Sequence, residues 1–204
     1  RRFDVSRSVL IPRPETEHLI YATLEWCQQN TREELLDIAD IGSGSGCLAI
    51  TLANEIKNSS VDATDISAEA VAAGVDNART LGVSDRVAFY QGDLFTPLQG
   101  KAYDIIVSNP PYVEQGTKQQ LSPEVTGYDP AEALFAGADG MVVIDRLVPQ
   151  ASLNLKPDGI FMLEFGFGQR ALIEALFAKH FKQLKIIDDY AGIPRVAVAT
   201  NPIN

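Results

Sequence analysis

The stretch Asp40-Ile41-Gly42-Ser43-Gly44-Ser45-Gly46 links an expected strand to an expected helix, and it decides the fold. The apolar run at 35–41 predicts a buried strand that ends in this loop. Residues 47–56 predict the helix that follows. Three glycines at alternate positions let the backbone turn sharply and approach a ligand closely. This pattern predicts a parallel α/β sheet with a ligand at the loop, while a tight strand-to-helix turn without a ligand is the alternative.

Strand and helix patterns alternate along the rest of the chain. Further strands are expected at 61–66, 87–90, 103–108, 160–165, 185–187 and 196–199, and further helices at 14–28, 67–81, 138–155 and 169–181. A turn is expected at 156–159 and a helix kink at Pro149. The pattern predicts one mostly parallel, seven-stranded sheet with helices on both faces. Residues 1–204 are expected to form a single domain, in which 1–30 is a lead-in strand and helix and 31–204 the catalytic core.

Composition narrows the classes of function. The 204 residues carry a net charge of −10, which weighs against a nucleic-acid substrate. Two cysteines and two histidines show no metal-ligand spacing, so neither a zinc site nor a disulfide is expected. The chain contains no apolar run approaching the ~20 residues of a membrane span, and a cytoplasmic location is the default. Because the chain opens with Arg1 in place of methionine, it is interpreted as a fragment or a trimmed chain.

A rigid polar motif, Asn109-Pro110-Pro111-Tyr112, follows the strand expected at 103–108. Proline has no N–H to donate to a sheet, so two prolines end the strand, and each restricts the residue before it to extended geometry. Asn109 is therefore held at the carboxyl end of a strand, where open α/β sheets bind ligands. A fixed amide and its neighbouring carbonyls can accept two hydrogen bonds from a planar –NH2 group, over which Tyr112 can stack. An ordinary strand-ending turn explains the motif alone equally well.

Acidic residues at strand ends supply candidate contacts for a nucleoside. Asp65 lies close to the ~20-residue offset at which an acidic residue binds ribose hydroxyls in such folds. Asp62 is the competing candidate, but it lies in mid-strand. Asp93 follows the third strand and can accept a hydrogen bond from an adenine amino group, with Leu94 packed on the ring. A lone aspartate in a loop is usually a turn residue, so the pair Asp93 and Leu94 depends on its context.

The motifs together resemble a known family. The loop at 40–46 resembles the Asp/Glu-x-Gly-x-Gly-x-Gly loop of class I S-adenosylmethionine (SAM) methyltransferases and lacks the full Gly-x-Gly-x-x-Gly dinucleotide fingerprint. With Asn109 to Tyr112 it resembles the amino-directed members, which modify adenine N6 or a glutamine amide. Val-Leu-Ile-Pro-Arg-Pro-Glu-Thr-Glu at 9–17, Leu-Glu-Phe-Gly at 163–166 and the stretch 189–196 resemble the HemK/PrmC family. These enzymes methylate N5 of a glutamine in class 1 peptide release factors.

The resemblance implies a Rossmann-like fold, SAM as cofactor, S-adenosylhomocysteine as product, and a release factor as protein partner. The implied cofactor-binding residues are Leu10, Arg13, Thr16, Gly42, Ser43, Gly44, Ser45, Gly46, Asp65, Ile66, Asp93, Leu94 and Asn109. The implied substrate-binding residues are Asn109, Pro110, Pro111 and Tyr112, of which Asn109, Pro110 and Tyr112 are the catalytic candidates. Family members carry a small helical domain before the stretch at 9–17, and its absence here puts affinity for the release factor in question.

Three other functions remain open at this stage. An N6-adenine methyltransferase of DNA or RNA would share the glycine loop and Asn109 to Tyr112, with a flipped base on Tyr112. The family acting on ribosomal protein L3 usually carries Pro-Arg-Ser-Pro where this chain has Pro-Arg-Pro-Glu-Thr-Glu. A module that binds SAM without turnover is the third. The long stretch 113–129 is expected to be a functional loop or lid, in which Glu124 and Asp129 are expected to be solvated charges.

Overall fold

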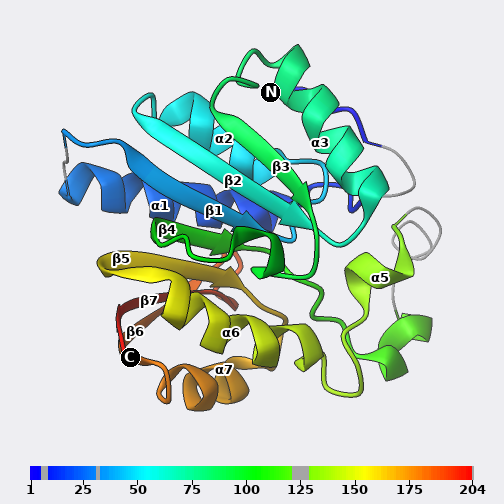
Figure 1. Ribbon diagram of the computed structural model, residues 1–204. Helices are drawn as coiled ribbons and strands as arrows, with labels where there is room; N and C mark the ends of the chain where they lie inside the picture. The colour runs from blue at the N-terminus through cyan, green and yellow to red at the C-terminus, as the bar shows by residue number, and fades with distance from the viewer. Residues whose placement is uncertain (6–8, 31–32, 121–128, 204) are drawn as a thin grey trace.

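A seven-stranded sheet runs through the middle of the molecule (Figure 1). The computed structural model describes residues 1–5, 9–30, 33–120 and 129–203. The strands are β1 (Leu36–Ile41), β2 (Ser59–Asp65), β3 (Val87–Gln91), β4 (Tyr103–Ser108), β5 (Leu155–Glu164), β6 (Phe181–Asp188) and β7 (Pro194–Pro202). Their order is β3-β2-β1-β4-β5-β7-β6. The strand β7 pairs antiparallel with β5 and β6, and the other four pairs are parallel. The predicted mostly parallel sheet is confirmed.

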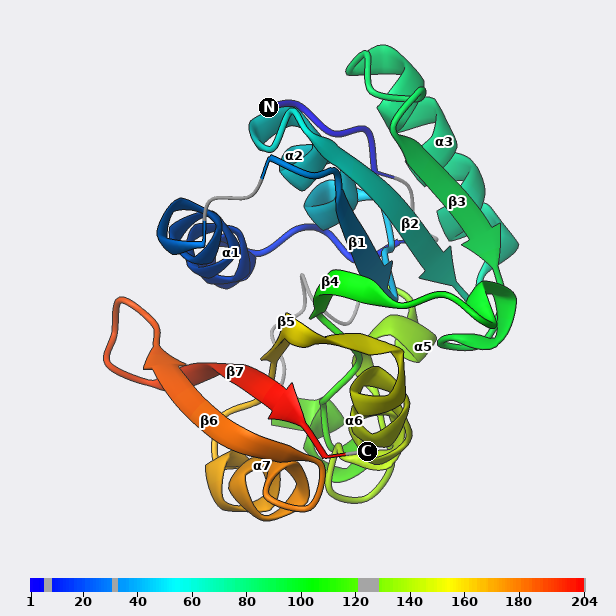
Figure 2. The same cartoon turned by 60° about the vertical axis from the view of Figure 1, so that its left-hand side comes forward.

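Helices cover both faces of the sheet (Figure 2). On one side lie α1 (Glu17–Gln29), α2 (Cys47–Glu55) and α3 (Ala68–Thr80), and on the other α6 (Val142–Asn154) and α7 (Arg170–Phe177). The short elements are η1 (Pro14–Thr16), η2 (Thr96–Leu98), η3 (Gln115–Gln120) and α5 (Ala131–Leu134). Successive strand residues face opposite sides, so Ile105 packs in one core and Ile106 in the other. Burial on both faces explains why β4 reads as a mainly apolar run.

Several boundaries differ from the prediction, and the described residues of the lead-in segment 1–30 contain helices but no strand. The turn expected at 156–159 lies inside β5, because β5 already pairs with β4 at Leu155 and the register shifts before Ile160. Such an irregularity accommodates a proline within a strand. The helix expected from residue 138 begins at Val142, after Gly140 with φ of +72°. The helix expected to reach 181 ends at Phe177, and Phe181 opens β6.

The sheet order places a crevice between β1 and β4. These two strands are neighbours, but the chain leaves β1 for α2 on one face and leaves β4 toward α6 on the other. At such a switch point the loops diverge, and ligands bind beyond the carboxyl ends of the strands. The arrowheads of β1, β2 and β3 point toward the side where α5 lies (Figure 1). The glycine loop and Asn109 both follow strands that end at this edge.

Candidate active site

A cavity of about 490 Å³ lies at the carboxyl ends of β1 to β4. This volume is in the range of small-molecule and cofactor sites. Of the residues predicted to bind cofactor or substrate, the wall contains Gly42, Gly44, Asp65, Ile66, Asp93, Leu94, Asn109 and Pro111. The fold therefore brings together residues from four separate strand ends.

The glycine loop needs its glycines for backbone reasons. Gly42, Gly44 and Gly46 have φ of +77°, +53° and +78°, values that residues other than glycine rarely adopt. A Cβ at Gly46 would also lie 2.8 Å from the Phe89 ring. Ser43 and Ser45 belong to the same loop but are buried outside the cavity wall. The loop thus presents backbone rather than side chains to the cavity.

Asp65 joins the glycine loop to the end of β2. One of its carboxylate oxygens accepts from the Gly44 N–H at 2.8 Å and the other from the Ser67 N–H at 2.9 Å. A carboxylate has about four acceptor positions, so Asp65 retains capacity toward the cavity. Asp62 lies outside the wall and accepts from Lys101 Nζ at 2.6 Å and Tyr103 Oη at 2.9 Å. The geometry favours Asp65 over Asp62 as the acceptor for a ribose diol.

The opposite part of the wall is largely apolar. Leu94, at φ of +49°, shares the wall with Phe135 and Val143. Asp93 is also in the wall, where its carboxylate pairs with Arg146 of α6. An apolar slot with one carboxylate at its edge and a diol acceptor at Asp65 fits an adenine nucleoside. The residues present therefore fit the nucleoside part of SAM.

Asp40 lies under the glycine loop with no access to solvent. Its Oδ2 accepts from the Ala49 N–H at 3.0 Å, which ties the end of β1 to the first turn of α2. Its Oδ1 has no hydrogen-bond partner among the described residues. Burial raises the pKa of Asp40 to about 7, partly offset by the hydrogen bond from Ala49.

The side chain of Asn109 belongs to a buried hydrogen-bond chain. Asn109 Nδ2 donates to Thr16 Oγ1 at 2.9 Å, and Thr16 Oγ1 donates to Glu164 Oε2 at 3.0 Å. Tyr112 Oη donates to the other oxygen of Glu164 at 2.9 Å. Burial raises the pKa of Glu164, and the hydrogen bonds from Tyr112 and Thr16 and the charge of Arg195 oppose that shift. Burial and the carboxylate of Glu164 also raise the pKa of Tyr112, so its phenol stays neutral.

A buried glutamine fixes the backbone that follows the prolines. Gln169 Nε2 donates to the carbonyls of Tyr112 and Asp139, both at 3.0 Å, and Gln169 Oε1 accepts from the Gly166 N–H at 2.7 Å. Pro110 is buried and Pro111 lies in the cavity wall. The motif is therefore held by the prolines at one end and by Gln169 at the other.

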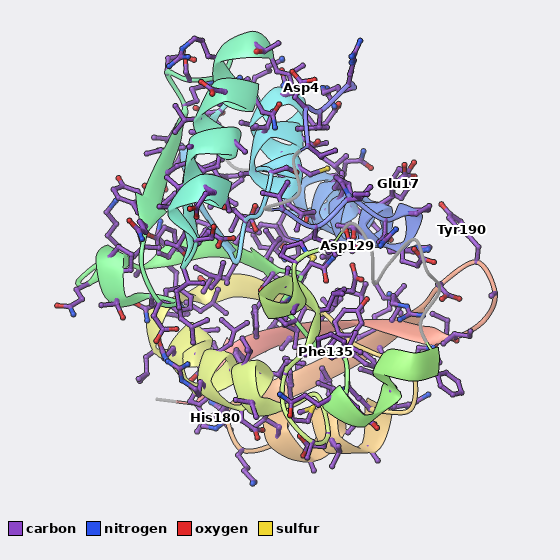
Figure 3. The ribbon with its side chains drawn as sticks, turned by 90° about the vertical axis from the view of Figure 1, so that its right-hand side faces the viewer. Asp4, Glu17, Asp129, Phe135, His180 and Tyr190 are labelled. Carbon is purple, nitrogen blue, oxygen red and sulfur yellow. The ribbon has the colours of Figure 1, made fainter. Side chains whose placement is uncertain are left out.

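The lead-in segment closes over the same edge of the sheet. Asp129 Oδ1 accepts from the Ile11 N–H at 3.0 Å, and Asp129 pairs with Arg13. Asp129 lies near the middle of the face seen in Figure 3. The expectation of a solvated Asp129 is wrong, because its side chain has 0% exposure. Glu124 and the part of the expected lid at 121–128 lie outside the described residues.

The predicted cofactor residues of the lead-in segment, Leu10, Arg13 and Thr16, lie outside the cavity wall, as do Ser43, Ser45 and Gly46 of the glycine loop. Arg13 and Thr16 line a neighbouring cavity of about 540 Å³ between α1, α2 and the first residues of the chain. Leu10 is half-buried and lines neither cavity. Thr16 reaches the site through Asn109, so its contact is with the catalytic candidate.

Sequence reasoning missed the partners that hold the site. Glu164 carried a usable signal, since it is a lone carboxylate at the end of the apolar run Ile160-Phe161-Met162-Leu163. Gln169 and Arg146 carried none, because a polar residue at a helix start or on a helix face is ordinary. Phe135 follows α5, a helix that was not predicted.

Two negative findings concern the part of the chain that the structure describes. It contains no group of three or more histidine, cysteine, aspartate or glutamate side chains able to hold a metal ion. Within the same residues, no helix is long and apolar enough to cross a membrane.

Comparisons with known proteins agree with this geometry. The family model of the methyltransferase small domain matches residues 24–156. The release factor glutamine methyltransferase of Koribacter versatilis (strain Ellin345) is 42% identical over 203 residues, which cover 99% of this chain and 70% of that protein. The protein of the same name in Bacillus subtilis (strain 168) is 40% identical over 204 residues, which cover 98% of this chain and 70% of that protein. The solved N-terminal domain of human METTL16 in complex with SAH matches with a TM-score of 0.69 and 15% identity, covering 97% of this chain and 75% of that one.

The solved structure establishes the fold alone: a seven-stranded sheet of the class I SAM-dependent methyltransferase type. The curated relatives go further, because they match almost every residue of this chain at about 40% identity and share one name. The chain belongs to the release factor glutamine methyltransferase family.

Proposed function

We propose that the protein transfers a methyl group from SAM to the N5 side-chain amide of the glutamine in the Gly-Gly-Gln motif of class 1 peptide chain release factors. The proposed setting is the cytoplasm, where this modification modulates translation termination. One observation carries the proposal. Asn109 lines the cofactor-sized cavity and is anchored through its amide nitrogen, so its amide oxygen is left as an acceptor for a substrate –NH2 group.

The cofactor would be held by residues that the fold brings to one cavity. The carboxylate of Asp65 would accept from the ribose hydroxyls, and Leu94 and Phe135 would enclose the adenine. Asp93 would accept from the adenine amino group while it keeps its partner Arg146. When bound, SAM supplies a methyl group that its sulfonium already activates.

The chain's own contribution is to orient and polarise the amide. An amide nitrogen is a poor nucleophile, because its lone pair is delocalised. Hydrogen bonds from its two N–H groups to Asn109 Oδ1 and the Pro110 carbonyl would fix its direction and stabilise positive charge that develops on it. The ring of Tyr112 would pack against the flat amide. The methylated nitrogen would carry the positive charge until it releases one proton to solvent, so this step needs no strong base. A neutral phenol of raised pKa at Tyr112 agrees with that.

The alternatives make different demands on the protein. A methyltransferase of DNA or RNA would need to attract a polyanion, and a net charge of −10 opposes that. A glutamine methyltransferase of ribosomal protein L3 would use the same chemistry at Asn109. The names of the curated relatives favour the release factor as the protein substrate.

A direct assay separates these functions. The protein is incubated with SAM and, in parallel, with a class 1 release factor, ribosomal protein L3 or a DNA duplex, and peptide mass spectrometry locates the added methyl group. Methylation of the glutamine in the Gly-Gly-Gln motif is expected. Methyl on adenine, with none on protein, would overturn the proposal. Asn109→Ala is the matched inactive variant and should lose about 100-fold or more in turnover, while its affinity for SAM changes little.

A further inference from the structure

We propose that Glu164 and Thr16 are positioning residues that orient the side-chain amide of Asn109 with its oxygen toward the substrate. The inference rests on the proposed function, because it specifies how Asn109 becomes an acceptor for an amide –NH2 group. Neither residue would contact the reacting atoms. Thr16 would act on Asn109, and Glu164 would act through Thr16.

The direction of each hydrogen bond follows from the number of protons available. An ionised carboxylate only accepts, so Glu164 Oε2 takes the single hydroxyl proton of Thr16 at 3.0 Å. The Thr16 oxygen then has only lone pairs to offer its other neighbour. Asn109 must turn its NH2 group to Thr16, as the 2.9 Å contact from Nδ2 shows. Since the nitrogen and oxygen of an amide diverge from one carbon, Oδ1 points away from Thr16.

The opposite orientation would disable the proposed acceptor. An Asn109 amide turned by half a rotation would present its NH2 group to the –NH2 group of the substrate. Two donors facing each other form no hydrogen bond and leave both groups unsatisfied. Without Glu164, the Thr16 hydroxyl is free to donate to Asn109 Oδ1, which favours this unproductive orientation. The carboxylate therefore decides which end of the amide meets the substrate.

The pairing of β4 with β5 places Asn109 and Glu164, the two ends of this hydrogen-bond chain, next to each other. Ser108 pairs with Leu163 in the register of β4 and β5, so the next residues, Asn109 just after β4 and Glu164 at the end of β5, lie side by side. Thr16 comes from η1, in the lead-in segment, and is 6% exposed. The role of this segment is thus to supply a hydroxyl to Asn109.

A matched pair of threonine variants tests the proposal. Thr16→Val removes the hydroxyl, and Thr16→Ser keeps it. Thr23→Val is the control, because Thr23 is also buried between α1 and β5, where its hydroxyl donates to the Leu19 carbonyl at 2.7 Å and lies 3.3 Å from Met162 Sδ. We expect kcat with the release factor to fall between about tenfold and 100-fold in Thr16→Val, and SAM affinity to change less than twofold. Thr16→Ser should retain most of kcat.

Two results would overturn the proposal. One is a kcat for Thr16→Val that falls no further than that of Thr23→Val. The other is a parallel loss of SAM affinity in Thr16→Val, which would make Thr16 a cofactor contact.

A second measurement reports on Asn109 without turnover. In the ¹⁵N-labelled free protein, one Nδ2 proton of Asn109 should exchange slowly with solvent, because Thr16 accepts it. Glu164→Leu should abolish that protection although Glu164 does not touch Asn109, and unchanged protection would refute the role of Glu164. Wild-type protein that methylates no glutamine would refute the proposed function, while this amide signal would still decide whether Glu164 orients Asn109.

Discussion

The hydroxyl group of Tyr112 donates a hydrogen bond to the buried carboxylate of Glu164 at 2.9 Å, and this contact links the segment after β4 to the last residue of β5. Both oxygens of Glu164 therefore have a donor, since Thr16 occupies the other one. Burial and the charge of Glu15 raise the pKa of Glu164. Arg195 and the two hydrogen bonds lower it. The balance makes the ionised state of Glu164 sensitive to Tyr112.

Removal of the Tyr112 hydroxyl should shift the pH dependence of catalysis. Because only ionised Glu164 forces Thr16 to accept from Asn109, activity should fall as pH falls through the pKa of Glu164. Tyr112→Phe deletes a hydrogen bond that lowers this pKa, so the acidic limb of kcat should move to higher pH. The ring remains, and kcat on the alkaline side should stay within a few-fold of wild type. Profiles of kcat from pH 5 to 9 test this, and an unmoved limb would contradict it.

Asp65 and Asp62 lie three residues apart and should differ sharply in their effect on SAM binding. Asp65 lies in the cavity wall and holds Gly44, so Asp65→Ala should weaken SAM binding by about tenfold or more. Asp62 accepts from Lys101 and Tyr103 outside the cavity, so Asp62→Ala should leave the affinity within about twofold. Titration calorimetry with SAM measures both. If Asp62→Ala lost as much affinity as Asp65→Ala, or more, the assignment of the ribose to Asp65 would be wrong.

The elements around these acids could be predicted because their signals are local. A mainly apolar run predicted β4, and glycine spacing predicted the loop before α2. Ser67 caps α3 by accepting from the Ala70 N–H at 3.2 Å. The prolines after Asn109 likewise fix the backbone through their own geometry. Each of these inferences needs only a few neighbouring residues.

The contacts that complete the site could not be predicted, because their partners are far apart in the chain. Thr16 and Glu164 are separated by 148 positions, and Arg13 and Asp129 by 116. A sequence shows that Asp129 is charged, but the fold decides that it is buried against Arg13. The expected turn at 156–159 failed for a related reason, since pairing with β4 outweighs local turn chemistry.

The buried carboxyl of Asp40 should make stability depend on pH in an unusual direction. Its pKa is about 7 in the folded protein against 3.8 for the ordinary side chain. The folded state then binds the proton more tightly, so this group stabilises the fold below about pH 4 and loses that contribution as pH rises to about 7. Each pKa unit corresponds to about 1.4 kcal/mol, so the change is roughly 4 kcal/mol.

Asp40→Asn isolates this effect, because an amide does not titrate. The free energy of unfolding of the variant, minus that of wild type, should rise by several kcal/mol between pH 4 and pH 7 in urea titrations. Asp76→Asn on the exposed face of α3 is the control for the loss of a carboxylate charge. A difference for Asp40→Asn that does not change between pH 4 and pH 7 would mean that the carboxylate is solvated in the folded state.

Gly140 should tolerate no side chain, because a Cβ there would collide with the backbone of Tyr112. A Cβ built on Gly140 would lie 2.1 Å from the Tyr112 carbonyl oxygen and 2.5 Å from Gln169 Nε2. Gly82 has nearly the same φ, +71° against +72°, but a Cβ there meets nothing within 4 Å. Gly82→Ala should therefore cost only the left-handed strain of about 1–2 kcal/mol. Gly140→Ala should cost about 1–3 kcal/mol more, since the displaced atoms are backbone.

The displacement in Gly140→Ala should also reach the active site. The added Cβ would break the 3.0 Å hydrogen bond between Gln169 Nε2 and the Tyr112 carbonyl. The segment from Asn109 to Tyr112 should then lose its fixed position. Methyl transfer should fall by about tenfold or more at a temperature where the variant is still folded, while Gly82→Ala keeps normal turnover. Urea unfolding and the release factor assay measure the two effects. If Gly140→Ala matches Gly82→Ala in both, the carbonyl of Tyr112 is not held against Gly140 as the structure shows.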